Sequence, residues 1–200
     1  MHLLMPTVLC VAFVRTVLIL LSFVRGAGSP EMFQLWGGGS PFKQNSNNTL
    51  TDSKGVNVRL LADVAASWGE LHRRMQAGQS LLVGVASRSD EPAWARECLR
   101  KFIVSPGVTM MDVVTQERCE IYKGSKRDHF EALHTKTGIA YQKMCFFDDD
   151  MENIRDVSGI GVHCFYTPDG VTTALFEQGL RAIAGGKDPW EAFSSGPSGS

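Results

Sequence analysis

The sequence predicts an α/β fold with a parallel β-sheet that is covered by helices on both faces. Two observations carry this prediction. Three short runs, 81–86 (LLVGVA), 144–147 (MCFF) and 160–166 (IGVHCFY), are almost entirely apolar and have the length of buried strands. Segments with apolar residues at helical spacing alternate with these runs. Apolar strands that alternate with helices are typical of a parallel sheet whose two faces are both buried.

The helices follow from the same periodicity and from their end signals. The first ends at Gly78, and the second begins after Glu91-Pro92 with Ser89 or Asp90 as its cap. Further helices are expected over 125–137, ending at Gly138, then over 151–157 and 172–184. The predicted buried positions are Leu61, Val64, Trp68, Leu71 and Met75 in the first helix, Ala95, Cys98, Leu99 and Phe102 in the second, and Phe130 and Leu133 in the third.

The composition excludes several classes of protein. Among 200 residues, 20 Lys and Arg face 21 Asp and Glu, so there is no basic surplus and nucleic acid is excluded as the main partner. Hydrophobic residues make up 44% of the chain, which is enough to bury a core. Five cysteines without a C-x-x-C pair indicate reduced thiols in a cytoplasmic setting rather than a disulfide framework or a zinc site.

The first 34 residues differ from the rest and form an atypical apolar segment. The run 16–24 is too short for a transmembrane helix of about 20 residues, so a membrane partner is not expected. Three interpretations stay open: a signal peptide that would send the chain along the secretory pathway, a buried strand, or a misassigned gene start. The stretch 35–56, rich in Gly, Ser and Asn, is predicted to be a flexible connector. The main domain spans 35–190, and a disordered tail spans 191–200.

Polar side chains follow two of the predicted strands, at the edge of the sheet where ligands bind in open α/β folds. Asp148, Asp149 and Asp150 follow one strand. Adjacent carboxylates repel one another, and a hard cation such as Mg²⁺ relieves that repulsion. We therefore expect Asp148 and Asp149 to hold a metal ion, whereas Asp150 is expected to cap the next helix.

Three further residues are candidates for binding an anion. Ser87, after the first strand, can turn its hydroxyl toward an anion, although a helix cap would also explain it. Arg88 is either a solvated charge or an anion clamp. Lys126 enters a helix after a turn, and turned inward it would neutralise both a phosphate and a carboxylate. Along this chain the hydroxyl comes first, the lysine next and the acidic pair last. A bacterial receiver domain has the reverse order, with its acidic pair early and its lysine last.

In this order the residues resemble the haloacid dehalogenase (HAD) superfamily, specifically its magnesium-dependent phosphatase-1 branch. The resemblance runs from about 49 to 183 and rests on Val85-Ala86-Ser87-Arg88-Ser89, Glu120-Ile121-Tyr122-Lys123-Gly124-Ser125-Lys126, His129-Phe130, Lys136-Thr137-Gly138-Ile139, Met144-Cys145-Phe146-Phe147-Asp148-Asp149 and Asn153-Ile154. It implies a Rossmann-like fold with a small or absent cap, dependence on Mg²⁺, and hydrolysis of phosphate monoesters through an aspartyl-phosphate. Phosphotyrosine in proteins or small sugar phosphates are the implied substrates.

The resemblance also implies a role for each matching residue. Ser87 would donate a hydrogen bond to the phosphoryl group, and Arg88 would contact the substrate beside it. Lys126 would steady the charges of the phosphoryl group and of the nucleophile. Asp149 would bind Mg²⁺, with Asp148 as its supporting neighbour.

One part of the family pattern is missing. The first strand of the family ends in D-x-D-Y-T-L-W, which supplies the nucleophile and the general acid and base. The corresponding stretch, 30–36 (PEMFQLW), keeps only Leu35-Trp36, and residues 1–51 contain no aspartate. We therefore expect no catalytic nucleophile, impaired hydrolysis, and a weakened sheet unless 16–24 replaces the first strand.

Two explanations of this loss remain. One is a wrong or alternative first exon, which the intact downstream motifs favour. The other is an inactive HAD-fold module that binds phosphorylated ligands or a protein partner.

Overall fold

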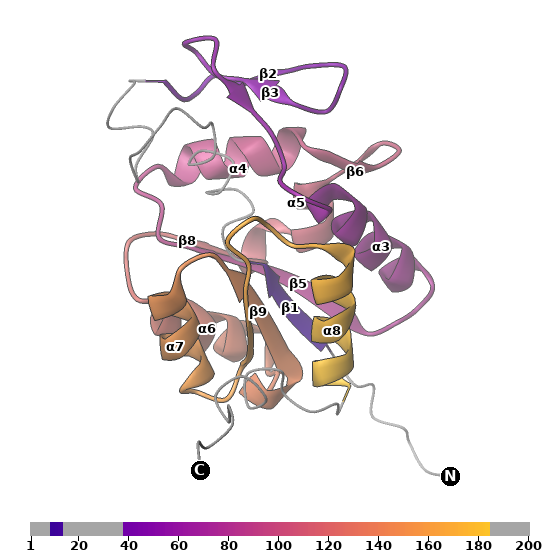
Figure 1. Ribbon diagram of the computed structural model, residues 1–200, viewed down its shortest axis with the longest axis vertical. Coiled ribbons are helices and arrows are strands. Elements are labelled where there is room, and N and C mark those ends of the chain that lie inside the picture. Colours follow the sequence, from indigo (N-terminus) through magenta and orange to yellow (C-terminus); the bar gives the residue numbers. More distant parts are fainter. Residues whose placement is uncertain (1–8, 14–37, 185–200) are drawn as a thin grey trace, which may run out of the picture.

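A five-stranded parallel sheet forms the centre of the computed structural model, which describes residues 9–13 and 38–184 (Figure 1). The strand order is β10-β9-β1-β5-β8, and each strand runs parallel to its neighbours. The strands are β1 (Leu9–Phe13), β5 (Leu81–Ser87), β8 (Cys119–Ile121), β9 (Met144–Asp148) and β10 (His163–Tyr166). The predicted α/β class with a parallel sheet is confirmed.

Helices cover both faces of the sheet, because its strands are apolar on both sides. In β9, Cys145 and Phe147 belong to one hydrophobic core, whereas Met144 and Phe146 belong to the other. This division reflects the alternation of side chains along a strand. The first core is closed by α3 (Val64–Gln76), α4 (Pro92–Lys101), α5 (Met110–Val114) and α8 (Thr173–Ile183), and the second by α6 (Lys126–Thr137) and α7 (Met151–Ser158).

The predicted helices are confirmed, with ends that differ by a few residues. Helix α6 begins after its cap Ser125 and ends at Gly138, which has the left-handed conformation that glycine favours. The predicted cap of α4 is wrong: its cap position is Glu91, without a side-chain hydrogen bond. Ser89 Oγ instead accepts a hydrogen bond from Glu91 N at 3.0 Å and so closes the turn before the helix. Two 3₁₀ turns, η1 (Gln116–Arg118) and η2 (Tyr141–Lys143), precede β8 and β9.

The predicted connector over 35–56 is wrong where the structure describes it, from residue 38. It contains part of a small antiparallel sheet of β2 (Lys43–Gln44), β3 (Leu50–Thr51) and β4 (Asn57–Val58). Phe42 and Leu50 are buried in the first core. Glu97 of α4 fixes the segment by accepting hydrogen bonds from Phe42 N at 2.9 Å and Ser40 Oγ at 2.6 Å. A second small hairpin, β6 (Ile103–Ser105) with β7 (Val108–Thr109), follows α4.

The central strand of the sheet comes from the apolar N-terminal segment. Strand β1 lies between β5 and β9, with Ala12 opposite Gly84 and Phe13 opposite Phe147. The expected substitute, 16–24, lies outside the described residues, as do 30–36 and the predicted tail. The sheet therefore gains its middle strand from 9–13, a run that the sequence analysis did not single out.

Two further expectations concern thiols and membranes. The thiols of Cys98 and Cys119 are free and buried, and burial raises the pKa of Cys119 to about 11. Such thiols stay protonated near neutral pH. Within 9–13 and 38–184, the structure has no helix with the length and apolar character needed to cross a membrane.

Candidate functional site

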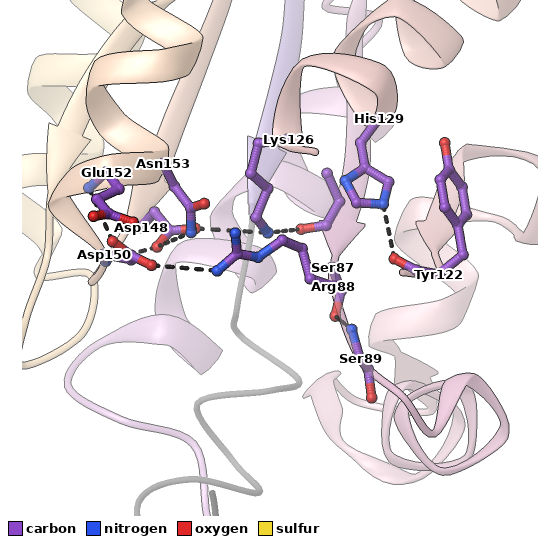
Figure 2. A network of polar contacts seen from close by, with 11 residues as sticks. Ser87, Arg88, Ser89, Tyr122, Lys126, His129, Asp148, Asp150, Glu152 and Asn153 are labelled. Carbon is purple, nitrogen blue, oxygen red and sulfur yellow. Dashed lines mark hydrogen bonds and ion pairs between the residues drawn. The ribbon is translucent and has the colours of Figure 1, made fainter. Parts of the chain in front are cut away.

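The candidate site lies at the carboxyl edge of the sheet, where β5 ends at Ser87 and β9 ends at Asp148. Strand β1 lies between these two strands, so the ends of all three meet at this edge. Lys126, the first residue of α6, points into the same place, with its ammonium group between Ala86 O and Asp148 (Figure 2). The structure thus brings together side chains that are up to about 60 residues apart, counted from Ser87 to Asp148.

Lys126 and Asp148 form a buried ion pair. Lys126 Nζ donates a hydrogen bond to Ala86 O at 2.7 Å and lies 3.7 Å from Asp148 Oδ2. The side chains are 1% and 0% exposed, respectively. Removing one member of such a pair leaves an uncompensated charge in the interior, so each depends on the other. The inward orientation considered for Lys126 in the sequence is the one observed.

The Asp148 carboxylate is held from two further directions. Asn153 Nδ2 lies 3.2 Å from each of its oxygens, and Asp150 N donates to Oδ1 at 2.7 Å. Asn153 comes from the first turn of α7 and is itself buried. The short segment between β9 and α7 therefore folds around this carboxylate, which fixes its position at the end of β9.

Ser87 is buried at the end of β5, and its hydroxyl faces the turn that follows. Its Oγ accepts a hydrogen bond from Ser89 N at 3.3 Å. A hydroxyl that accepts from an amide still has its own proton to donate. The geometry is thus compatible both with a turn-closing role and with donation to an anion, the two roles that the sequence left open.

Arg88 and Asp150 lie at the outer side of the site. Asp150 Oδ1 accepts a hydrogen bond from Glu152 N at 2.9 Å, which confirms its predicted role as the cap of α7. Its Oδ2 lies 3.5 Å from Arg88 Nη2. The side chain of Arg88 is 44% exposed, so it remains accessible from solvent.

The carboxylates of Asp148 and Asp149 are the natural oxygen donors for a metal ion here. Asp149 is half-buried and directly follows β9. Mg²⁺ commonly takes one or two carboxylates from a protein and completes its shell with water and substrate phosphate, so the residue types at these two positions suit that ion. Among the described residues no cluster of three or more His, Cys, Asp and Glu forms a larger metal site. The assignment of Asp149 and Asp148 to a metal stays a prediction.

His129 belongs to the site but was given no role in the sequence analysis. It is fully buried one turn after Lys126, and its Nε2 lies 3.1 Å from Tyr122 O. A carbonyl can only accept, so Nε2 carries the proton and Nδ1 has the free electron pair. The ring also packs against Tyr122, with 4.3 Å between centroids. His129 therefore holds the turn that leads into Lys126; its spacing of three residues from Lys126 on one helix face is the signal that could have identified it.

The environment of His129 keeps it neutral. Burial, followed by the positive charge of Lys126, lowers its pKa to about 4, although Tyr122 O, Glu120 and Asp128 act in the opposite direction. At neutral pH the site therefore contains the charge of Lys126 without a second cation from His129.

Comparison of the sequence with known proteins places the chain among phosphatases. A family model described as acid phosphatase matches residues 30–185. Magnesium-dependent phosphatase 1 of Homo sapiens is 36% identical over 144 residues, which cover 72% of this chain and 74% of that protein. A HAD-like hydrolase superfamily protein of Schizosaccharomyces pombe is 31% identical over 131 residues, covering 62% and 70%.

A solved structure is also similar. It is that of 3-deoxy-D-manno-octulosonate 8-phosphate phosphatase from Moraxella catarrhalis, with a TM-score of 0.45, 14% identity, and coverage of 95% of this chain and 93% of that one. The family match begins at residue 30, so it leaves out β1 (Leu9–Phe13), although β1 is central in the sheet.

The buried ion pair leads to a prediction about stability. Lys126→Met removes the cation beside the buried Asp148 carboxylate, and we expect the free energy of unfolding to fall by about 3–5 kcal/mol. The double variant Lys126→Met/Asp148→Asn buries neither charge and is expected to recover part of this loss. Urea denaturation at pH 7 measures both variants. Equal stabilities of the single and double variants would contradict the pairing.

The lowered pKa of His129 leads to a prediction about pH. Between pH 6.5 and 4, histidine in the unfolded chain binds a proton while His129 in the folded chain does not, so protonation favours unfolding. Stability contributed by neutral His129 is therefore present at pH 7 and is lost as the pH falls through this window. In His129→Gln that loss should be absent. Urea denaturation of both proteins at pH 7, 5.5 and 4.5 tests this, and parallel pH profiles would rule it out.

Proposed function

The chain belongs to the acid phosphatase family, in the magnesium-dependent phosphatase-1 branch of the HAD superfamily, and from this premise we propose that its site binds phosphate monoesters together with Mg²⁺ but hydrolyses them poorly. The ligands would be phosphorylated small molecules or phosphoproteins. The proposal separates binding, for which the described residues are present, from hydrolysis, for which a nucleophile is required.

The observation that carries the proposal is the register of β1. Phe13, the last residue of β1, lies opposite Phe147, and Phe147 directly precedes Asp148. In this family the strand at the centre of the site ends in D-x-D. Here the sequence continues after Phe13 with Val14, Arg15 and Thr16. Neither valine nor threonine supplies a carboxylate that could attack phosphorus, and residues 1–51 contain no aspartate.

The residues available for contact with a ligand support the first part of the proposal, the binding of phosphate monoesters. Lys126 would offset the negative charge of a phosphoryl group, as it already does for Asp148. The Ser87 hydroxyl would donate a hydrogen bond, and Arg88 would contact the ligand from the outer side. A bound Mg²⁺ would be held by Asp148 and Asp149 and would neutralise charge on the phosphoryl oxygens. Each of these contacts requires a charged or hydroxyl group but no covalent step.

A second function is compatible with the missing nucleophile. A module with this binding set and no nucleophile would hold a phosphorylated ligand or partner without turning it over. Turnover separates the two functions, since weak hydrolysis that stops when Mg²⁺ is chelated supports a phosphatase, whereas binding without any turnover supports the module.

The proposal predicts that two carboxylates placed after β1 restore hydrolysis. Val14 and Thr16 follow Phe13 with the spacing of D-x-D, so the change is Val14→Asp/Thr16→Asp. Because loss of a nucleophile lowers the rate by a factor on the order of 10⁴ or more, we expect at least about a hundredfold gain in kcat with p-nitrophenyl phosphate and Mg²⁺.

Val14→Asn/Thr16→Asn is the matched control, since it adds similar side chains without the charge. Full activity of the unmodified chain would contradict impaired hydrolysis. An inactive aspartate variant that still binds phosphate would show that β1 does not end at the reacting phosphorus.

A further inference from the structure

Arg88 and Asp150 connect two strand ends across the site. Arg88 directly follows β5, and Asp150 lies two residues after the end of β9. Strand β1 lies between these strands, yet Arg88 Nη2 is 3.5 Å from Asp150 Oδ2. The pair therefore bridges the carboxyl end of the sheet at the level of β1, and Figure 2 shows the Arg88 side chain extended toward Asp150.

The two partners differ in how firmly they are held. Asp150 is anchored through its other oxygen, which accepts the hydrogen bond from Glu152 N, and through its own N–H, which donates to Asp148. Arg88 has the more exposed side chain, 44% against 24% for Asp150. When the pair opens, Arg88 is therefore the partner that moves, because its side chain is long and exposed whereas the Asp150 carboxylate is anchored.

We propose that Asp150 weakens ligand binding by holding Arg88 away from the ligand, so that an anion gains the contact with Arg88 only by displacing the Asp150 carboxylate. This inference rests on the proposed binding of phosphate monoesters. The incoming ligand exchanges the Asp150 carboxylate for its own oxygens as the partner of Arg88. No covalent bond changes in this exchange.

The exchange of Asp150 for a ligand as the partner of Arg88 costs little free energy, and its gain depends on the charge of the ligand. A partly exposed ion pair at 3.5 Å is weak, so opening it lowers affinity only a few-fold. A dianionic phosphate monoester offers Arg88 more negative charge and can accept a bidentate pair of hydrogen bonds. It therefore gains more binding free energy from Arg88 than a monoanion does. Lys126 cannot take this role, because its ammonium group is buried between Ala86 O and Asp148.

The test compares inorganic phosphate binding in four forms of the full chain by titration calorimetry at pH 7.5, with Mg²⁺ fixed. They are the unmodified chain, Asp150→Asn, Arg88→Gln and the double variant. Asparagine caps a helix as well as aspartate does, so Asp150→Asn removes the charge while α7 keeps its cap. Asp156→Asn, an exposed position on the same helix, is the matched control for a lost negative charge.

We expect Asp150→Asn to bind phosphate about two- to fivefold more tightly, in proportion to a weak ion pair. Asp156→Asn should leave the affinity unchanged, and Asp150→Asn should have no effect in the Arg88→Gln background. Unchanged affinity in Asp150→Asn, or the same gain without Arg88, would overturn the inference while leaving phosphate binding intact. Absence of phosphate binding in all four forms would overturn the proposed function and this inference together.

Discussion

The position between β5 and β9 constrains the whole molecule, because both strands need a hydrogen-bonded neighbour there. Backbone N–H and C=O groups in the middle of a sheet lie away from water, and leaving them unpaired is costly. Strand β1 meets this need by pairing with β5 on one side and β9 on the other. Only with that position filled do Ser87 and Asp148 stand at one edge, close enough for Lys126 to contact both strands.

Charge at this edge is balanced by a small number of groups. Lys126 pairs with Asp148 inside, Arg88 pairs with Asp150 outside, and His129 stays neutral beside them. A phosphate that binds as proposed would compete with Asp150 for Arg88, and a metal ion that neutralises the nearby carboxylates would favour its binding.

Much of the fold can be predicted from the sequence, because most of the longer elements after residue 58 have strong apolar patterns. The short elements β6, β7, α5 and β8 were not predicted. The small sheet up to residue 58 could not be predicted, since its strands have two residues each and the segment is held by long-range contacts such as the hydrogen bond from Phe42 N to Glu97. Periodicity also could not choose 9–13 rather than 16–24 as the central strand, because both runs are apolar.

Within the site, Ser87, Lys126 and Asp148 could be identified because each stands where an apolar strand or a turn ends. The role of His129 could not be predicted, since it depends on a contact with the carbonyl of Tyr122; its spacing from Lys126 indicates only that both lie on one face of the helix. The pairing of Arg88 with Asp150 joins residues 62 positions apart and needs the folded sheet.

Hydrogen–deuterium exchange of the full chain tests most directly whether β1 is the central strand. The backbone amides of 9–13 that are hydrogen-bonded inside the sheet are expected to exchange as slowly as those of the neighbouring strand β5. Exchange of 9–13 at the rate of unprotected amides, with β5 still protected, would contradict the account. It would remove both the central strand and the observation on which the proposed impairment of hydrolysis rests.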